Sequence, residues 1–270
     1  MPHGIDPKNE RIERSAIKPP STLLALAEGW RAIAEASALL PSIPWLDQMP
    51  RGDGHAVYVM PGFMADNRST SMLCRWLDRL GYEAVPWGFG RNLGPRGDLQ
   101  LRIVEQVGIV AREAGGPISL IGQSLGGIYA REVAKVAPEM VRQVITLGSP
   151  FGQVEANGTY PAVLRLFEMA SGESIDTMRN RTFDVPKPPP VPSTAIFSRT
   201  DGVADWKACI EEETPHTDNV EVVGSHCGMG FNPAIYYVIA DRLNQPHGRW
   251  LKFDRSGIRR FFFPDPVYAV

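Results

Sequence analysis

The segment ISLIGQSLGGIYAREVA, residues 118–134, places a serine among glycines between an apolar run and a helical pattern. A serine on a sharp turn between a strand and a helix has a strained backbone and very close neighbours. Glycine has no side chain, so it avoids a clash two residues before and two residues after such a serine. We therefore interpret Gly122 and Gly126 as part of a strand–turn–helix that exposes the Ser124 hydroxyl at a sheet edge.

Short apolar runs alternate with helical patterns after residue 50, which is typical of a parallel sheet with helices on both faces. The strands are continuous apolar runs, as expected where both faces of a sheet are buried. The sequence predicts strands at residues 55–63, 82–90, 117–124, 141–150, 193–201 and 219–226. The expected fold class is therefore α/β, with a doubly wound and mostly parallel sheet of about six strands.

Three regions lie outside this alternation and suggest the domain organisation. Residues 1–50 are predicted to be an N-terminal extension that carries an amphipathic helix over residues 21–40. The main domain is expected to span residues 51–245. Residues 151–192 contain no convincing strand, which indicates a small cap or lid inserted into that domain. Residues 246–270 contain RRFFF and are expected to be a tail docked on the domain.

A reactive serine needs a base to remove its proton, and that base needs an acid to orient it. On this architecture the three follow one another along the chain as serine, acid and histidine, each at a strand end. Asp201 ends the strand-like AIFSRTD, and His226 follows VEVVGS. We therefore predict that Ser124, Asp201 and His226 form a catalytic triad. The nearest rival acid, Asp205, is expected to lie in the helix that follows.

Negative charge develops on the substrate oxygen during acyl transfer, so two hydrogen-bond donors must face that oxygen. The backbone N–H of Leu125, directly after the serine, is the first candidate. The second is expected in the loop MPGFMADN, where Gly62 allows close approach and Phe63 is the preferred donor. Met64 stays open as an alternative donor, one residue further on. The predicted substrate pocket is lined by apolar side chains of Met64, Phe151, Leu164, Phe167 and Met229.

These segments resemble the α/β-hydrolase family, and within it a poorly characterised bacterial group of lipase- and esterase-like serine hydrolases. The resemblance covers roughly residues 55–245 and depends on MPGFMADNRS, GQSLGG, SRTDGVADW and GSHCGMG. It implies that Ser124 is the nucleophile, Asp201 the acid and His226 the base. The chain departs from the family in having Pro61 where a histidine often precedes the glycine. The RNLGP segment, residues 91–95, is shared with similar members but has no role that the sequence assigns.

The resemblance implies a serine carboxylester hydrolase that acts through an acyl-enzyme intermediate on esters with an apolar acyl group. An acyltransferase, a thioesterase and a polyester hydrolase would use the same triad, and a non-catalytic binding protein on this fold is a further alternative. No metal or organic cofactor is expected, because metal-ligating residues do not cluster with ligand spacing. A disulfide between Cys209 and Cys227 stays open.

The charge balance argues against nucleic acid as a partner, because the net charge is −2 and the basic residues are scattered. The expected partner is a small-molecule ester or lipid, and the oligomeric state stays open. Residues 1–20 contain no apolar core of a signal peptide, so a cytoplasmic protein is expected. The helix over residues 21–40 is too charged to span a bilayer. It either covers the core or a partner, or lies on a membrane surface.

Overall fold

The structure is a computed structural model that describes residues 17–152, 158–172 and 185–265. Its centre is a six-stranded sheet in the order β2-β1-β3-β4-β5-β6, in which every neighbouring pair is parallel. The strands are β1 (Ala56–Met60), β2 (Glu83–Pro86), β3 (Ile118–Gln123), β4 (Val141–Leu147), β5 (Ser193–Phe197) and β6 (Thr217–Glu221). The prediction of a six-stranded, doubly wound parallel α/β sheet is confirmed.

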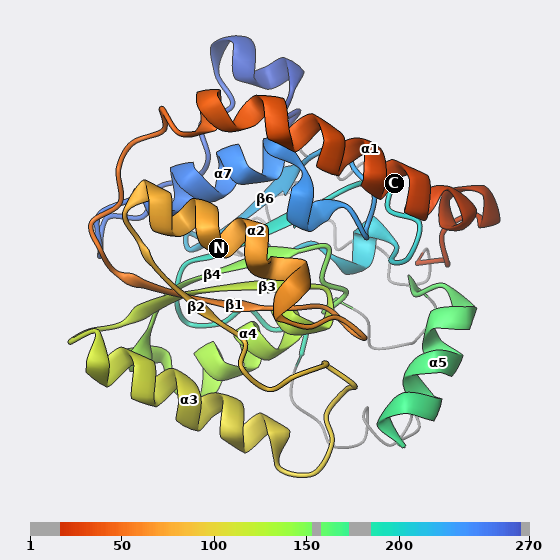
Figure 1. The fold of residues 1–270 in the computed structure, drawn as a ribbon, viewed down its shortest axis with the longest axis horizontal. Helices are drawn as coiled ribbons and strands as arrows, with labels where there is room; N and C mark the ends of the chain where they lie inside the picture. Colours follow the sequence, from red (N-terminus) through yellow and green to blue (C-terminus); the bar gives the residue numbers. More distant parts are fainter. Residues whose placement is uncertain (1–16, 153–157, 173–184, 266–270) are drawn as a thin grey trace, which may run out of the picture.

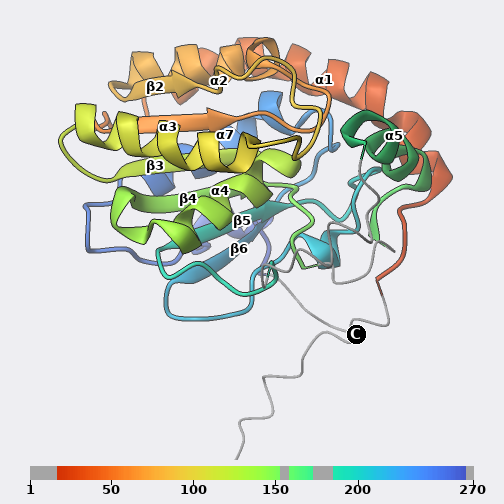
Figure 2. The same ribbon diagram turned by 90° about the horizontal axis from the view of Figure 1, so that it is seen from below.

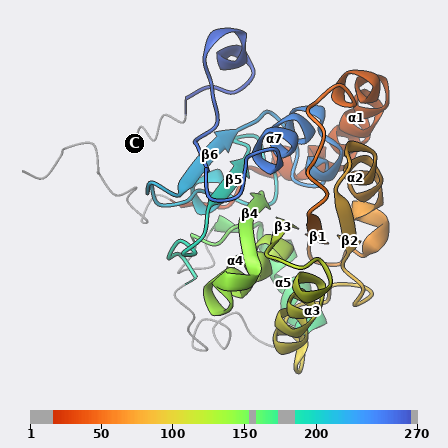
Figure 3. The same cartoon turned by 90° about the vertical axis from the view of Figure 1, so that its left-hand side faces the viewer.

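Helices cover both faces of the sheet (Figure 3). One face carries α3 (Leu99–Glu113) and α4 (Leu125–Val136), which enclose an apolar core with the inner strands. The other face carries a second core enclosed by α1 (Thr22–Leu46), α2 (Asn67–Leu80) and α7 (Pro233–Leu243). Because β1 and β5 are buried along their whole length, both sides of the sheet are packed and its carboxyl edge is held rigidly.

Helix α1 is longer than predicted, because it continues past Leu40 to Leu46 through two internal prolines. Proline removes a helical hydrogen bond and usually ends or kinks a helix. The helix persists because Leu39 and Leu46 are buried in the core beside α2 and α7. Its outward face is apolar and includes Leu23, Leu26, Trp30, Ile33 and Leu40. None of the helices in the described part of the chain is long and apolar enough to cross a membrane.

The prediction of a helix after Asp201, in the segment ADWKACIEEE, was wrong. A single 3-10 turn, η4 (Trp206–Ala208), stands there instead. The chain then leaves the helical path because the Glu211 carboxylate is buried, where it pairs with the Arg131 guanidinium and accepts a 2.7 Å hydrogen bond from the Ser193 hydroxyl. The other short 3-10 turns are η2 (Pro138–Met140), η5 (Met229–Phe231) and η6 (Gly257–Phe261).

The region between β4 and β5 contains α5 (Pro161–Ser171), which stands beyond the sheet at one side of the molecule (Figures 1 and 2). Residues 153–157 and 173–184 of the expected cap lie outside the described residues. The C-terminal tail packs on α7, where the Phe263 ring stacks on Tyr237 with centroids 5.6 Å apart. Phe253 and Phe263 are both buried in this contact.

Candidate active site

The backbone of Ser124 is strained, with φ of 51° and ψ of −119°, at the turn between β3 and α4. Among the described residues, Met64 and Ser124 are the only non-glycine residues with positive φ. Such strain persists only where the surrounding structure enforces it, and it is common at functional sites. The Ser124 amide donates a 2.8 Å hydrogen bond to the Leu147 carbonyl at the end of β4. The turn therefore holds a partly exposed serine at the carboxyl edge of the sheet.

The glycines around this serine have no room for a side chain. A Cβ atom on Gly122 would overlap the backbone of Gly126, and one on Gly126 would overlap the Met60 carbonyl. A Cβ atom on Gly127 would overlap the Ser149 hydroxyl. The close contacts inferred from the sequence are therefore present, and they bring β3, α4 and the end of β1 together.

Asp201 and His226 form a buried pair at the same edge. The His226 Nδ1 atom lies 2.6 Å from Asp201 Oδ2. The other carboxylate oxygen of Asp201 accepts hydrogen bonds of 2.7 Å from the amides of Val203 and Ala204. The rival acid Asp205 instead accepts from the Lys207 amide and caps η4. The geometry therefore pairs His226 with Asp201, as the order along the chain predicted.

Charge and burial act in opposite directions on the His226 imidazole. Burial alone would lower the pKa of His226, because the charged form loses water. The charge and hydrogen bond of Asp201, together with the charge of Glu28, outweigh this and raise the pKa above its ordinary value. An imidazole in this setting accepts a proton readily, which suits a general base.

The serine segment and the histidine segment meet through the residue before the nucleophile. The Gln123 side-chain amide donates a 3.0 Å hydrogen bond to the His226 carbonyl. A Cβ atom on Gly148, at the end of β4, would lie 3.2 Å from Asp201 Oδ2. Within the described residues, no hydrogen bond joins the Ser124 hydroxyl to His226. Catalytic hydrogen bonds are often long in ligand-free proteins and shorten when substrate binds.

The two backbone amides predicted as oxyanion donors, those of Phe63 and Leu125, lie in segments that adjoin or follow Ser124. Within the described chain, the N–H groups of Phe63 and Leu125 have no hydrogen-bond acceptor. The Met64 amide, by contrast, donates a 2.7 Å hydrogen bond to the Asn92 carbonyl. A Cβ atom on Gly62 would lie 3.4 Å from the Ser124 Cβ, so this loop directly adjoins the serine. The geometry favours Phe63 over Met64 as the second donor.

Asn92, in the RNLGP segment, holds the loop that carries Phe63 and was not assigned a role from the sequence. Its side-chain amide donates a 2.9 Å hydrogen bond to the Pro61 carbonyl, and its backbone N–H donates to the Ala65 carbonyl at 2.8 Å. Its own carbonyl receives the Met64 amide. Asn92 is almost fully buried and fixes both ends of the loop. The sequence signal that could have indicated this role was the asparagine in the RNLGP motif, which had no other explanation.

The predicted pocket residues occupy different environments. The Phe167 ring of α5 lies 5.1 Å from the Phe63 ring, so the cap helix contacts the loop beside the serine. Leu164 is half-buried on the same helix, and the Met64 side chain is exposed. Met229 is buried, and its sulfur lies against Gly148.

Phe151 was predicted to line the substrate pocket, but its side chain lies in the protein interior. Its ring is fully buried and stacks under the Arg131 guanidinium, 3.7 Å from the ring centroid. The sequence placed Phe151 directly after a strand end, but the Phe151 amide turns back to the Ser149 carbonyl at 2.9 Å. Phe151 therefore contributes to the interior around Arg131.

All three cysteines, Cys74, Cys209 and Cys227, are free thiols, so the Cys209–Cys227 disulfide that the sequence left open is not formed. Burial, with contributions from Glu28, Asp201 and Glu35, raises the pKa of the Cys227 thiol to about 12. A thiol with this pKa is protonated at neutral pH and is a poor nucleophile. Cys227 is therefore a weak rival to Ser124, although it adjoins His226 in the chain.

A second serine–histidine–aspartate arrangement lies at the opposite, amino edge of the sheet. The His55 Nε2 atom lies 2.8 Å from the Ser119 hydroxyl, and Nδ1 contacts the Asp53 carboxylate. Ser119 is fully buried inside β3 and has ordinary strand geometry. Burial lowers the pKa of His55 despite its hydrogen bond to Asp53. A buried hydroxyl without access to substrate indicates a structural role for this group.

No set of three or more metal-ligating side chains gathers anywhere in the described ranges of the chain.

No family model matches the chain. A region of 71 residues, 26% of this chain, is 43% identical to proteins named triacylglycerol lipase from Pseudarthrobacter phenanthrenivorans and Burkholderia plantarii. It covers 22% and 19% of those proteins, so the match spans about a fifth of the length of these curated relatives. Over this region the likeness in sequence is substantial, and it does not extend to the whole of either protein.

Solved structures resemble the chain over a much larger share. Aspergillus fumigatus lipase B matches 74% of this chain and 55% of its own, with a TM-score of 0.53 and 15% identity. Bacillus licheniformis lipase BlEst2 matches 73% and 95%, with a TM-score of 0.52 and 15% identity. MGS-MChE2, an alpha/beta hydrolase enzyme from a lagoon-sediment metagenome, matches 71% and 90%, with a TM-score of 0.50 and 19% identity. Together with the parallel sheet and the strained turn at Ser124, these likenesses show that the chain has the α/β-hydrolase fold.

Proposed function

We propose that this protein is a serine carboxylester hydrolase in which Ser124 is the nucleophile, His226 the general base and Asp201 the acid that orients it. The observation that carries the proposal is the buried His226–Asp201 pair at the sheet edge where the strained Ser124 lies. The names of the partial relatives, both triacylglycerol lipases, support an ester as substrate.

The first half-reaction transfers the acyl group to the protein. The Ser124 oxygen attacks the ester carbonyl carbon while its proton passes to His226 Nε2, since Nδ1 is bonded to Asp201. The carbonyl oxygen becomes an oxyanion, which the free amides of Phe63 and Leu125 stabilise. The intermediate then collapses, and the alcohol leaves with the proton that His226 had accepted. The product is an acyl ester of Ser124.

The second half-reaction uses water in place of the alcohol. Water gives one proton to His226 and attacks the acyl carbonyl, again through an oxyanion held by the same two amides. Collapse breaks the bond to Ser124, which recovers its proton from His226, and the carboxylic acid is released. The protein returns to its starting state without a cofactor.

The surroundings of Ser124 favour a substrate with an apolar acyl group. The Phe63 and Phe167 rings contact each other, Phe63 lies on the loop that adjoins the serine through Gly62, and Met64 is exposed on the same loop. Burial of acyl carbons against such side chains stabilises binding by about 0.8 kcal/mol per methylene. A small-molecule ester or lipid with an apolar acyl group fits these contacts.

A panel of p-nitrophenyl esters of rising acyl length, run with the parent and with Ser124→Ala, tests the proposal. We expect turnover to rise with acyl length in the parent and to vanish in the variant. An optimum at acetate would contradict the apolar acyl pocket but leave the triad intact. Hydrolysis that survives Ser124→Ala would contradict the triad. Added alcohol distinguishes an acyltransferase, because ester product would then exceed free acid.

A further inference from the structure

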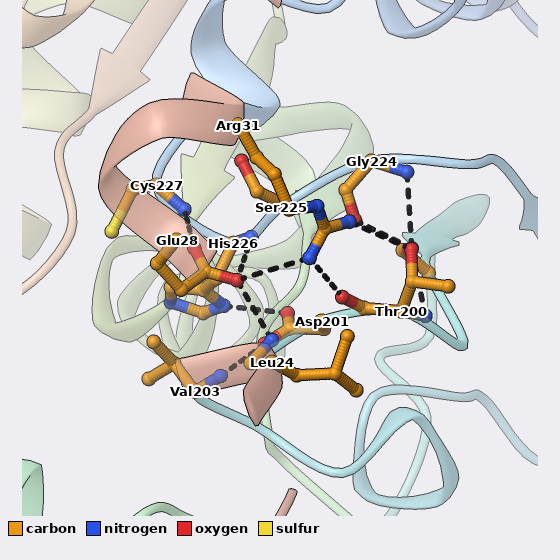
Figure 4. Close-up of polar contacts among 12 residues, drawn as sticks. Leu24, Glu28, Arg31, Thr200, Asp201, Val203, Gly224, Ser225, His226 and Cys227 are labelled. Carbon is orange, nitrogen blue, oxygen red and sulfur yellow. Dashed lines mark hydrogen bonds and ion pairs between the residues drawn. The ribbon is translucent and has the colours of Figure 1, made fainter. Parts of the chain in front are cut away.

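The Glu28 and Arg31 side chains of α1 point into the protein, toward the loops that carry Asp201 and His226 (Figure 4). Glu28 is only 5% exposed, although it lies on a helix at the surface. Its outward neighbours on α1, Leu26 and Trp30, are apolar and exposed. The helix therefore presents its charges inward, which is the reverse of the usual arrangement for a helix on a soluble domain.

A single carboxylate bridges the two loops. Glu28 Oε1 accepts hydrogen bonds from the Gly202 amide at 2.8 Å and from the His226 amide at 3.1 Å. Glu28 Oε2 accepts from the Cys227 amide at 2.8 Å. Gly202 directly follows Asp201, so Glu28 contacts the chain beside both members of the acid–base pair. All three partners are backbone N–H donors, so both oxygens of the carboxylate act as acceptors.

We propose that Glu28 is a positioning residue for the reaction, whose carboxylate fastens the Asp201 loop to the His226 loop and keeps the imidazole aligned with Ser124. This inference rests on the proposed function, since it assigns a role toward the same triad. It gives a function to the N-terminal extension, which the sequence left without one.

Each of the two loops has a glycine where α1 approaches it. A Cβ atom on Gly202 would lie 2.5 Å from the Leu24 carbonyl oxygen, so only glycine allows the first turns of α1 to lie there. On the other loop, a Cβ atom on Gly228 would overlap the Glu35 carboxylate. At Gly202 the backbone of α1 therefore lies directly on the loop, and at Gly228 the Glu35 side chain of α1 does so.

Two further side chains of α1 each contact one loop. The Arg31 guanidinium donates to the Thr200 carbonyl at 2.6 Å and to its hydroxyl at 2.8 Å. Glu35 Oε1 accepts from the Ser225 amide at 2.7 Å. Among the described side chains of α1, Glu28 is the one that joins both loops, and this separates its role from general anchoring of the helix.

The charge of Glu28 also acts on His226. It contributes to the raised pKa of the imidazole, after the larger effects of burial, which lowers the pKa, and of Asp201, which raises it. Arg31, 3.8 Å from Glu28 Oε1, offsets part of this negative charge. The Cys227 thiol stays neutral because its pKa is about 12. The titratable and charged groups that face this region are Asp201, Glu28, Arg31, Glu35, Cys227 and the buried Cys209.

Glu28→Gln tests the proposal, because glutamine keeps the length of the side chain but removes its charge and one acceptor. We expect kcat to fall about tenfold with KM within about twofold of the parent. The acidic limb of the pH–rate profile moves to lower pH, because the imidazolium loses a stabilising charge. NMR titration of the His226 imidazole should show the same direction. A merely structural loosening of α1 would admit water to the imidazole and raise the pKa of His226, which is the opposite direction.

Glu35→Gln is the matched control, since Glu35 lies on the same helix and contacts the same histidine loop but not the Asp201 loop. We expect its His226 titration to coincide with that of the parent. An unchanged titration in Glu28→Gln, or an equal displacement in both variants, would overturn the proposal.

Glu28→Asp provides a second test in case Glu28→Gln fails to fold. Aspartate keeps the charge but is one methylene too short to reach all three amides, so kcat should fall while the acidic limb stays nearer to that of the parent. A parental kcat in Glu28→Asp would contradict the positioning role. The NMR titration does not need a substrate, so a parent without esterase activity would end the proposed function while the Glu28 contact is still measured.

Discussion

The two non-glycine residues with positive φ, Met64 and Ser124, concentrate the backbone strain of the described chain at one site. At Ser124 the strain exposes the hydroxyl. At Met64 it turns the loop so that the Met64 amide bonds to Asn92 and the adjacent Phe63 amide is left free. Residues that hold such loops matter to the proposed reaction even though they do not touch the substrate.

Asn92→Ala should lower kcat by about tenfold or more, because the Pro61 carbonyl and the Gly94 amide lose their side-chain partners and the oxyanion loop relaxes. The expected loss of stability is about 1–3 kcal/mol, from the unpaired buried groups. Ester hydrolysis and urea denaturation measure the two effects.

Asn219→Ala is the matched control, since its buried side chain likewise bridges backbone groups, at Glu211, on the outer strand β6. It should lose similar stability with little change in kcat. If both variants lose kcat equally, the role given to Asn92 is wrong.

Sequence reasoning could identify the residues that carry the chemistry but not those that hold them. Ser124 stands in a motif whose glycines are required by close contacts, and Asp201 and His226 follow strands in a fixed order. Glu28 gave no such signal, because a glutamate on a helix is usually exposed to solvent. Its burial depends on loops that lie 174 to 199 residues away in the chain, which no local pattern reveals.

At the scale of elements, the parallel sheet separates two similar groups of polar side chains. The carboxyl edge holds Ser124, and the amino edge holds Ser119 with His55. Parallel strands with short turns place exposed functional groups at the carboxyl edge. The same residue types at the other edge are buried and tie β1 to β3.

His55→Ala should therefore destabilise the protein without affecting the proposed reaction. We expect a loss of about 1–3 kcal/mol in the free energy of unfolding, because the buried Ser119 hydroxyl loses its partner. The Asp53 carboxylate loses His55 but keeps its ion pair with Arg142. The kcat should stay within about twofold of the parent. A large loss of activity in a folded His55→Ala protein would contradict the assignment of the reaction to the carboxyl edge of the sheet.

The elements that sequence reasoning placed correctly are those with strong periodicity and ordinary ends. Each of the six predicted strands overlaps an observed strand, although most of the predicted ranges extend further at the carboxyl end. The predicted range of α1 ended at Leu40, six residues before the end of the helix, because local sequence cannot show that Leu46 is buried in the core. The helix after Asp201 failed for a related reason, since the buried pairing of Glu211 with Arg131 overrides local helical preference.

At the scale of the molecule, the two cores keep the sheet rigid, and the N-terminal extension closes over the acid–base pair. The site is thus assembled from segments spread from Glu28 to His226. The protonation of one buried imidazole consequently affects both the activity and the stability of the whole protein.

The raised pKa of His226 predicts the pH dependence of both properties. Since the neutral imidazole is the base, the acidic limb of kcat/KM should lie above the pH at which an ordinary histidine titrates, about 6.5. The protonated form favours the folded state, so this contribution to stability is present at pH below the unfolded value. It is lost as pH rises through the folded pKa. A limb below the ordinary value would contradict the assignment of His226.

The most direct test of the central claim is labelling with a fluorophosphonate, which reacts with a serine activated by a neighbouring base. Intact-mass analysis and peptide mapping of the parent should show one label, on Ser124. Ser124→Ala should remain unlabelled, and Asp201→Asn should label far more slowly. Absence of label in the folded parent, or a label on any residue other than Ser124, would contradict the account.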